Sequence, residues 1–254
     1  MNAIELQNLS CGYSPTNIIL RDLCGTLHHS SLTALLGENG IGKSTLLRTI
    51  CGVQPGYGGQ LLVEGEPLSD MQPRRLARTI SIVNTDVTGA GGLTVEELVA
   101  LGRHPFTGFF GRLTRHDRDI VTHALRQVGM NHARNSFVAT LSDGMRQKVM
   151  IARALAQTTP IIILDEPTAF LDAASRIETL QLLRDLAATR QKAILISTHD
   201  IGQVLPLASH LWLLTHSRRL VTGPTASLTS QPEIMDTLFG DRPVKFDPVR
   251  NDYR

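Results

Sequence analysis

Short runs of β-branched and other apolar residues alternate along the chain with segments of helical periodicity. The apolar runs predict strands, and the segments between them repeat apolar residues every three or four positions, as amphipathic helices do. This alternation favours an α/β fold with a mainly parallel sheet. We expect strands at 2–9 and 17–27, which look antiparallel, and at 32–36, 60–63, 80–83, 161–164, 193–197 and 211–214.

A block of helical patterns interrupts the strands between about Gly89 and Thr158. Strand character returns after it, so this block predicts a helical subdomain inserted into the α/β core. The residues after 223 carry two short helical patterns and a polar end that looks frayed. Helices are expected at 43–52, 94–102, 116–129, 144–157 and 173–190.

A glycine-rich turn connects the predicted strand 32–36 to the predicted helix 43–52. It reads GENGIGKST, which is a P-loop. In such a loop, backbone N–H groups converge on phosphate oxygens, the lysine reaches the β- and γ-phosphates, and the serine hydroxyl binds the metal. The helix also points its positive end at the phosphates. The expected contacts are Gly37, Glu38, Asn39, Gly40, Ile41, Gly42, Lys43, Ser44 and Thr45, with Ser44 as a Mg²⁺ ligand.

Two acidic residues follow the apolar strand 161–164. Asp165 stands at its carboxyl end, where it is placed to hold Mg²⁺ through water. Glu166 is placed to orient or deprotonate the water that attacks the γ-phosphorus. The alternative is that both residues merely terminate a strand, but the P-loop upstream favours catalysis. The chain is therefore predicted to bind ATP or another nucleoside triphosphate with Mg²⁺.

The order of these motifs resembles that of an ABC-type ATPase. After the P-loop come the segment 141–145 (LSDGM), then Asp165-Glu166, then Leu171-Asp172, and then His199. The resemblance covers nearly the whole chain. It implies an α/β fold: a P-loop NTPase (RecA-like) core with a mainly parallel sheet, an N-terminal antiparallel β-subdomain and an inserted α-helical subdomain.

The resemblance implies one ABC ATPase domain over residues 1–254. The nucleotide-binding core with its β-subdomain would comprise 1–88 and 159–223, and the helical subdomain with the signature segment would comprise 89–158. Residues 224–254 would form C-terminal helices and a tail.

The resemblance also assigns roles on the nucleotide side. Tyr13 matches the aromatic residue that stacks on adenine, with an exposed loop tyrosine as the alternative. His199, just after the strand 193–197, matches the residue that contacts the γ-phosphate and the attacking water. A lone histidine is otherwise a packed or solvated side chain. The expected catalytic residues are Glu166, His199 and Lys43.

In the family, two subunits pack head to tail, and the signature helix of one points its N-terminus at the γ-phosphate bound by the other. Ser142 and Gly144 match that signature, although these residue types also suit an ordinary helix N-cap. Asp172 matches the loop that crosses the dimer interface. The resemblance therefore implies a homodimer in which each site needs both chains.

Three positions depart from the family pattern. Asp143 and Met145 stand where the signature usually has glycine and glutamine, and Asp143 would place a negative charge near the partner's triphosphate unless it points away as a cap. Thr85 stands where a glutamine usually touches the metal or its water, and the register can slip by one onto Asn84. A threonine hydroxyl would need a bridging water there.

The segment 93–106 (LTVEELVALGRHPF) looks like the one found in ATPases of bacterial importers for iron-siderophore complexes, haem and cobalamin. The resemblance implies ATP hydrolysis that drives such uptake through two transmembrane permease subunits and, through them, a substrate-binding protein. The alternative for the segment is an amphipathic helix packed on its own subdomain. The residues expected to face a helix of a membrane subunit are Leu98, Leu101, Phe106, Phe109 and Phe110.

Composition indicates where in the cell the protein works and which partners it lacks. With 25 basic and 23 acidic residues, the net charge of +2 provides no footprint for nucleic acid. The three cysteines have neither disulfide nor metal spacing, which indicates a reducing compartment. Residues 1–5 lack a signal-peptide start, and no apolar stretch approaches the ~20 residues that span a bilayer. We expect a peripheral protein on the cytoplasmic face of the inner (cell) membrane.

Other functions remain open at this point. An ABC ATPase for another substrate, including an export half, would carry the same motifs. A non-transport ABC ATPase acting on ribosomes or DNA would usually need two fused halves or a long coiled-coil insertion. A regulatory nucleotide-binding module without turnover is supported only by Asp143, Met145 and Thr85. The residues do not separate iron chelates, haem and cobalamin as cargo.

Overall fold

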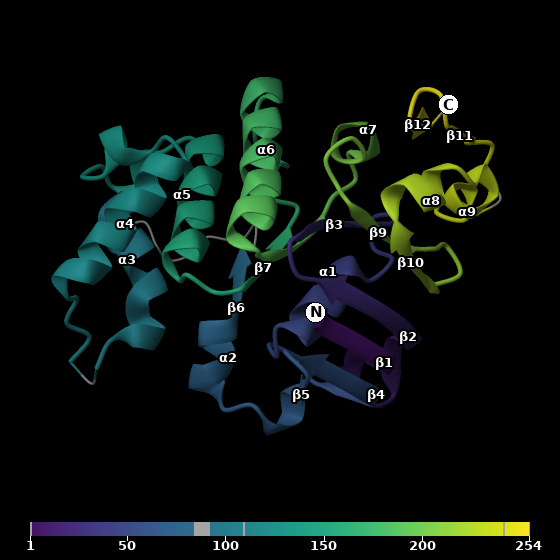
Figure 1. The fold of residues 1–254 in the computed structure, drawn as a ribbon, viewed down its shortest axis with the longest axis horizontal. Helices are drawn as coiled ribbons and strands as arrows, with labels where there is room; N and C mark the ends of the chain where they lie inside the picture. The colour runs from purple at the N-terminus through teal and green to yellow at the C-terminus, as the bar shows by residue number, and fades with distance from the viewer. Residues whose placement is uncertain (1, 84–91, 109, 241, 254) are drawn as a thin grey trace. The chain divides into compact units, whose positions relative to one another are not determined.

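The computed structural model describes residues 2–83, 92–108, 110–240 and 242–253 (Figure 1). The chain divides into two compact units. The first comprises residues 1–71 and 183–254, and the second comprises residues 72–182. The mixed α/β architecture, with a parallel sheet, antiparallel N-terminal strands and a helical insert, confirms the predicted fold class.

The first unit begins with an antiparallel sheet in the strand order β2-β1-β4-β5. Gly12 is required where β1 turns into β2, because a Cβ atom at this position would lie 2.2 Å from the backbone oxygen of Asn17. The prediction of two antiparallel strands is confirmed. The strands are β1 (Asn2–Ser14), β2 (Asn17–His28), β4 (Gly56–Val63) and β5 (Glu66–Pro67).

The second sheet of this unit is built around β3, which has parallel neighbours β8 and β9. All residues of β3 and β8 are buried, as expected for parallel strands covered on both faces. Trp212 on β9 is fully buried, and its Nε1 donates to the Thr26 oxygen at 3.3 Å. The strands are β3 (Ser31–Leu36), β8 (Ala193–Ser197), β9 (His210–Leu214) and β10 (Leu220–Pro224), which is antiparallel to β9.

The C-terminal part of the first unit is folded rather than frayed, so the prediction of a frayed end is wrong for the described residues. The Tyr253 hydroxyl donates to the Met235 oxygen at 2.7 Å, and the Tyr253 ring lies edge-on to Phe239 and Phe246. The elements, yellow in Figure 1, are α8 (Thr225–Thr229), α9 (Pro232–Asp236), β11 (Phe246–Asp247) and β12 (Asp252–Tyr253).

Helices predominate in the second unit. Capping boxes begin two of them, with Thr94 paired to Glu97 and Thr114 paired to Asp117. Among its described residues, the strands β6 (Ile80–Val83) and β7 (Ile161–Asp165) pair in parallel. The α-helices are α2 (Pro73–Thr79), α3 (Val95–Ala100), α4 (Arg115–Gln127), α5 (Asp143–Ala156) and α6 (Ala173–Arg190), within which the division between units falls.

The remaining helices are short. In the first unit α1 (Lys43–Ile50) follows β3, and α7 (Ile201–Val204) follows β8. The predicted helix 94–102 changes at Leu101 into a 3₁₀ helix. The 3₁₀ helices are η1 (Leu68–Asp70), η2 (Leu101–Phe106), η3 (Asn131–Ala133) and η4 (Val138–Thr140).

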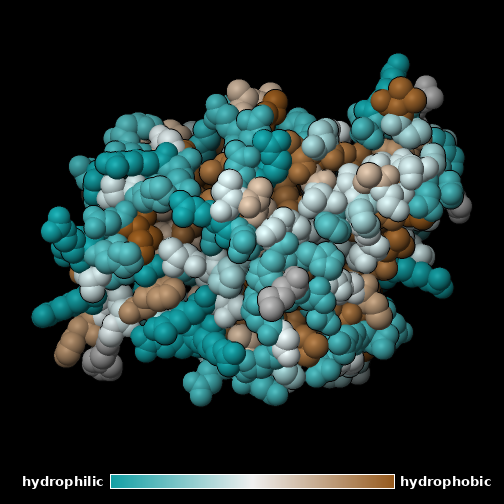
Figure 2. Space-filling model, viewed as in Figure 1, coloured by the Kyte–Doolittle hydropathy of each residue, from teal (hydrophilic) through white to brown (hydrophobic). Residues whose placement is uncertain are grey.

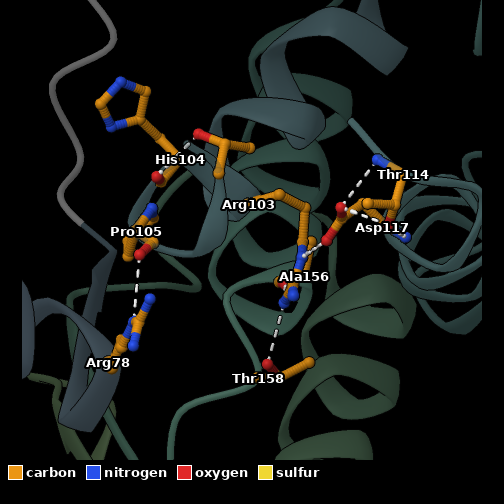
Figure 3. A network of polar contacts seen from close by, with 9 residues as sticks. Arg78, Arg103, His104, Pro105, Thr114, Asp117, Ala156 and Thr158 are labelled. Carbon is orange, nitrogen blue, oxygen red and sulfur yellow. Dashed lines mark hydrogen bonds and ion pairs between the residues drawn. The ribbon is translucent and has the colours of Figure 1, made fainter. Parts of the chain in front are cut away.

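A buried arginine anchors η2 to neighbouring elements (Figure 3). The Arg103 side chain is 5% exposed, and its Nε donates to Asp117 Oδ1 at 2.9 Å. Its Nη1 donates to the Ala156 oxygen at 2.8 Å and to Thr158 Oγ1 at 2.9 Å. Arg103 therefore joins η2 to the start of α4 and to the end of α5.

Candidate functional site

The P-loop follows the carboxyl end of the buried strand β3. Gly40 and Gly42 have positive φ angles of 78° and 121°, a conformation that favours glycine. A Cβ atom at Gly37 would lie 2.8 Å from the Leu214 oxygen, so the loop needs a residue without a side chain there as well. These glycines bend the backbone into the concave turn that a P-loop requires.

Lys43 and helix α1 supply the positive charge of this turn. Lys43 is buried, and its Nζ donates to the backbone oxygens of Gly37 at 2.8 Å and Glu38 at 3.1 Å. The N-cap residue of α1 is Gly42, which has no side chain to accept a hydrogen bond from the first turn. The half-buried Ser44 and the buried Thr45 follow it. The first turn of α1 therefore suits an external anion.

Tyr13 lies near the end of β1, and the residue is 65% exposed. Gln54 Nε2 donates to the Gly12 oxygen at 2.7 Å and so supports the backbone beside it. An exposed aromatic ring held on a strand is able to stack on a planar base.

His199 lies beside the P-loop in the first unit. It comes after β8, which pairs in parallel with β3, so the two loops leave the sheet at the same edge. The backbone N–H of Thr198 donates to the Leu35 oxygen at 3.3 Å. A cavity of about 280 Å³ is lined by Gly37, Glu38, Asn39, Thr198 and the exposed His199, among others. The structure thus brings the loop and the predicted γ-phosphate ligand together.

Asp165 and Glu166 belong to the second unit. Asp165 ends β7 after four buried residues and is itself half-buried. Glu166 has a φ of 47°, a left-handed conformation that is uncommon for a residue with a side chain. Its backbone oxygen accepts from Ala169 at 3.2 Å in the turn that follows. The two carboxylates stand where a strand gives way to a tight turn, as the sequence predicts.

The signature segment begins α5. Ser142 is the N-cap, and its Oγ accepts from the Met145 backbone N–H at 3.3 Å. Asp143 is therefore not the cap: its carboxylate is 69% exposed and pairs with Arg146 Nη1 at 3.1 Å. A Cβ atom at Gly144 would lie 3.2 Å from the Phe170 oxygen, which favours glycine there.

Asp172 faces the same hollow of the second unit as the signature segment. Its Oδ1 accepts from the Ser175 backbone N–H at 2.9 Å, and this hydrogen bond lowers the pKa of the Asp172 carboxyl. Ser142, Gly144, Met145 and Asp172 all line one cavity of about 550 Å³. The signature and the predicted interface loop are therefore neighbours.

The structure corrects one residue of the surface that the sequence predicts to face a helix of a membrane subunit. Leu98 is 2% exposed and belongs to the core of its unit, because α3 turns this residue inward. Leu101 and Phe110 are 49% and 82% exposed, and Phe106 is half-buried under Arg103, whose guanidinium carbon lies 4.1 Å from the ring centre. Phe109 lies outside the described residues, as do Thr85 and Asn84.

Hydrophilic side chains cover much of the face seen in Figure 2, with small hydrophobic patches between them. Within the part of the chain that the structure describes, none of the helices combines the length and the apolar character needed to cross a bilayer.

The candidate site residues fall into two groups. Tyr13, the P-loop and His199 lie in the first unit, and the residues of the second unit are Ser142, Gly144, Asp165, Glu166 and Asp172. Sequence reasoning missed two residues, His216 and Arg242, that contact the P-loop side chain of Glu38. No motif marks them, since His216 lies in the turn between β9 and β10 and Arg242 lies after α9.

Comparisons with known proteins agree with this geometry. Residues 20–169 match the ABC transporter family model. The chain is 34% identical to the iron(3+)-hydroxamate import ATP-binding protein FhuC of Bacillus subtilis (strain 168), over 99% of this chain and 93% of that protein. It is also 34% identical to the ferric enterobactin transport ATP-binding protein FepC of Escherichia coli (strain K12), over 93% and 86%.

A solved structure of an ATP-binding subunit of an ABC transporter has a TM-score of 0.80 and 26% identity, covering 93% of this chain and 98% of that one. The fold and the P-loop define a nucleoside triphosphatase. The chain belongs to the ABC transporter family, as an ATP-binding cassette of the kind that hydrolyses ATP.

Proposed function

We propose that this chain is the ATP-binding and hydrolysing subunit of an ABC importer, and that it energises uptake of an iron complex (siderophore or haem) or cobalamin through separate membrane subunits. The observation that carries the proposal is the glycine-bent P-loop at the uncapped start of α1, with Lys43 bonded into it. The import role is supported by the relatives that act on iron(3+)-hydroxamate and ferric enterobactin.

ATP would bind with its phosphates on the P-loop amides and Lys43, and its adenine on the exposed ring of Tyr13. Ser44 and Asp165 would hold Mg²⁺, and both fit the role because each is a half-buried oxygen donor, one in the first turn of α1 and one at the end of β7. Thr85 is a further candidate ligand of Mg²⁺. When bound, the ion neutralises charge on the β- and γ-phosphates.

Glu166 would orient the attacking water and take its proton, and His199 would contact the γ-phosphate. His199 is suited to this role because it borders the same cavity as the P-loop. In-line attack by an oriented water then needs little covalent help from the protein, since positioning and charge stabilisation supply most of the catalysis.

A head-to-tail homodimer would complete each site. The start of α5, with Ser142 and Gly144, would face the triphosphate of the partner subunit, and Asp172 would line the interface. The ion pair between Asp143 and Arg146 supports this arrangement, because it offsets the negative charge that replaces the usual glycine. The domain organisation proposed with this role is a core of 1–88 and 159–223, a helical subdomain of 89–158 and C-terminal helices and tail at 224–254.

The partners in this proposal are two transmembrane permease subunits and, through them, a substrate-binding protein. The chain would work on the cytoplasmic face of the inner membrane as a peripheral subunit. The exposed Leu101 and Phe110 of the second unit support a contact with a membrane subunit.

Three measurements test the proposal. Calorimetry with Mg-ATP should detect binding, and phosphate release should be measurable from the chain alone or with its membrane partners. The complex purified from its native membrane should then take up labelled iron chelates, haem or corrinoids. Uptake of an unrelated solute would support an ABC ATPase for another substrate. ATP binding with no phosphate release, whether from the chain alone or with its membrane partners, would instead support a regulatory module.

A further inference from the structure

Glu38 brings a carboxylate into the loop that is proposed to bind phosphate. Its side chain is only 13% exposed. A carboxylate that is poorly screened by water repels other negative charges, and a triphosphate is strongly negative. ATP binding at this loop is therefore expected to need a cation that neutralises Glu38.

Two groups from distant parts of the chain meet this carboxylate. Arg242 Nη1 lies 3.1 Å from Glu38 Oε1, an ion pair without the alignment of a hydrogen bond. His216 Nδ1 lies 2.9 Å from Glu38 Oε2 within hydrogen-bonding distance. Arg242 comes after α9 and His216 comes after β9. Two segments that are distant from the P-loop in sequence therefore meet the Glu38 side chain.

The backbone holds these two residues in place. The His216 N–H donates to the Thr237 oxygen at 2.9 Å, and the Arg242 N–H lies 3.4 Å from the Phe239 oxygen that accepts it. A Cβ atom at Gly240 would lie 3.0 Å from the His216 ring, so this stretch of chain passes close to the imidazole. The contact with Glu38 thus belongs to the folded C-terminal part of the unit.

The backbone of Glu38 is held at the same time by other residues of the P-loop. Its carbonyl oxygen accepts from Lys43 Nζ at 3.1 Å and from the Ile41 N–H at 3.3 Å. Arg242 also lines the 280 Å³ cavity that contains His199. Glu38 therefore contacts Lys43 through its backbone oxygen, while its carboxylate contacts His216 and Arg242.

We infer that Arg242, assisted by His216, is a positioning residue for ATP binding: it neutralises the Glu38 carboxylate and keeps this charge from opposing the phosphates. The inference rests on the proposed function, since it concerns the same nucleotide site. Arg242 touches Glu38, and in this proposal it acts on the nucleotide through that carboxylate.

A set of charge-neutralising variants tests this with the full chain. Mg-ATP binding is measured by calorimetry for the wild type, Arg242→Gln, Glu38→Gln and the double variant, with Arg250→Gln as the control. Arg250 is 74% exposed in the same C-terminal part and pairs only loosely with Asp247, at 3.9 Å. We expect Arg242→Gln to weaken ATP binding about fivefold and to raise KM while kcat is kept, because the positive charge opposite Glu38 is lost from an ion pair whose arginine is largely exposed.

Rescue distinguishes neutralisation from a purely structural role. The double variant should bind ATP within about twofold of Glu38→Gln, because Arg242 then has no charge to neutralise. A double variant as weak as Arg242→Gln, or wild-type affinity in Arg242→Gln, would overturn the inference. If Arg242→Gln does not fold, the comparison of Glu38→Gln with the double variant decides in the same way. Absence of ATP binding by the folded wild type would overturn the proposed function itself.

Discussion

Arg103 and Asp117 form an ion pair of 2.9 Å between side chains that are 5% and 9% exposed. Asp117 Oδ2 also accepts from the Thr114 N–H at 2.9 Å and from the Thr114 hydroxyl at 2.6 Å. One carboxylate thus begins α4 and holds the arginine that crosses to the end of α5 (Figure 3). A buried pair of this kind makes the removal of either partner costly.

Asp117→Asn should therefore destabilise the second unit. The substitution leaves the Arg103 guanidinium buried without its counter-charge, and breaking a buried pair costs about 3–5 kcal/mol. Urea unfolding at neutral pH measures the loss. Asp119→Asn is the matched control, since Asp119 is an exposed residue of the same helix. Equal midpoints for the two variants would contradict the prediction.

The stability that Asp117 provides should depend on pH in the acid range. The Thr114 hydroxyl, followed by the Thr114 N–H and Arg103, lowers the pKa of Asp117 from 3.8 to about 2 against the effect of burial. A carboxyl with a lowered pKa stabilises the fold above its unfolded pKa, and this contribution disappears as pH falls through the folded value. The stability gap between wild type and Asp117→Asn should narrow between about pH 4 and pH 2. A constant difference in stability between the two proteins over that pH range would contradict this prediction.

Gly102→Ala should disturb the packing of η2 on α5. An added Cβ atom would lie 2.3 Å from the Arg153 backbone oxygen, so the main chain has to move. Overpacking of this kind costs roughly 1–3 kcal/mol, which thermal unfolding would detect. Gly108→Ala should be nearly neutral, because a Cβ atom there meets no atom of the described residues within 4 Å.

Lys43→Ala should weaken ATP binding about 10–100-fold, because charge-assisted hydrogen bonds to the phosphates are lost. Calorimetry with Mg-ATP gives the affinity. Lys245→Ala is the comparison, since Lys245 is 68% exposed and pairs with Asp236 away from the P-loop. Retention of wild-type affinity in Lys43→Ala would mean that the lysine binds only the loop.

Glu166→Gln should leave ATP binding intact and slow turnover by about 10²–10⁴-fold, as expected for the loss of a general base. Steady-state phosphate release, measured beside calorimetry, separates the two effects. Glu233→Gln replaces an exposed glutamate of α9 and should keep normal turnover. Near-normal release from Glu166→Gln would place the base at another residue.

The strands, the P-loop and the start of α1 were predictable because each depends on local signals. The apolar run of β3, the glycines at 37, 40 and 42 and the lysine at 43 specify a strand, a tight turn and a helix without help from distant residues. The capping serine of α5 is local in the same sense. Residue type alone did not decide which residue caps this helix, because Ser142 and Asp143 both suit an N-cap; the structure shows Ser142 as the cap and Asp143 paired with Arg146.

The sequence by itself determined the order of the motifs and the chemistry they suit, since these depend on residue type and spacing along the chain. Only the tertiary structure decided that α3 ends at Ala100, that Leu98 faces inward, and that His216 and Arg242 meet Glu38. Those outcomes depend on contacts between residues as much as 204 positions apart, from Glu38 to Arg242. Periodicity and propensity carry information over a few residues only, so pairings of this range become visible when the chain is folded.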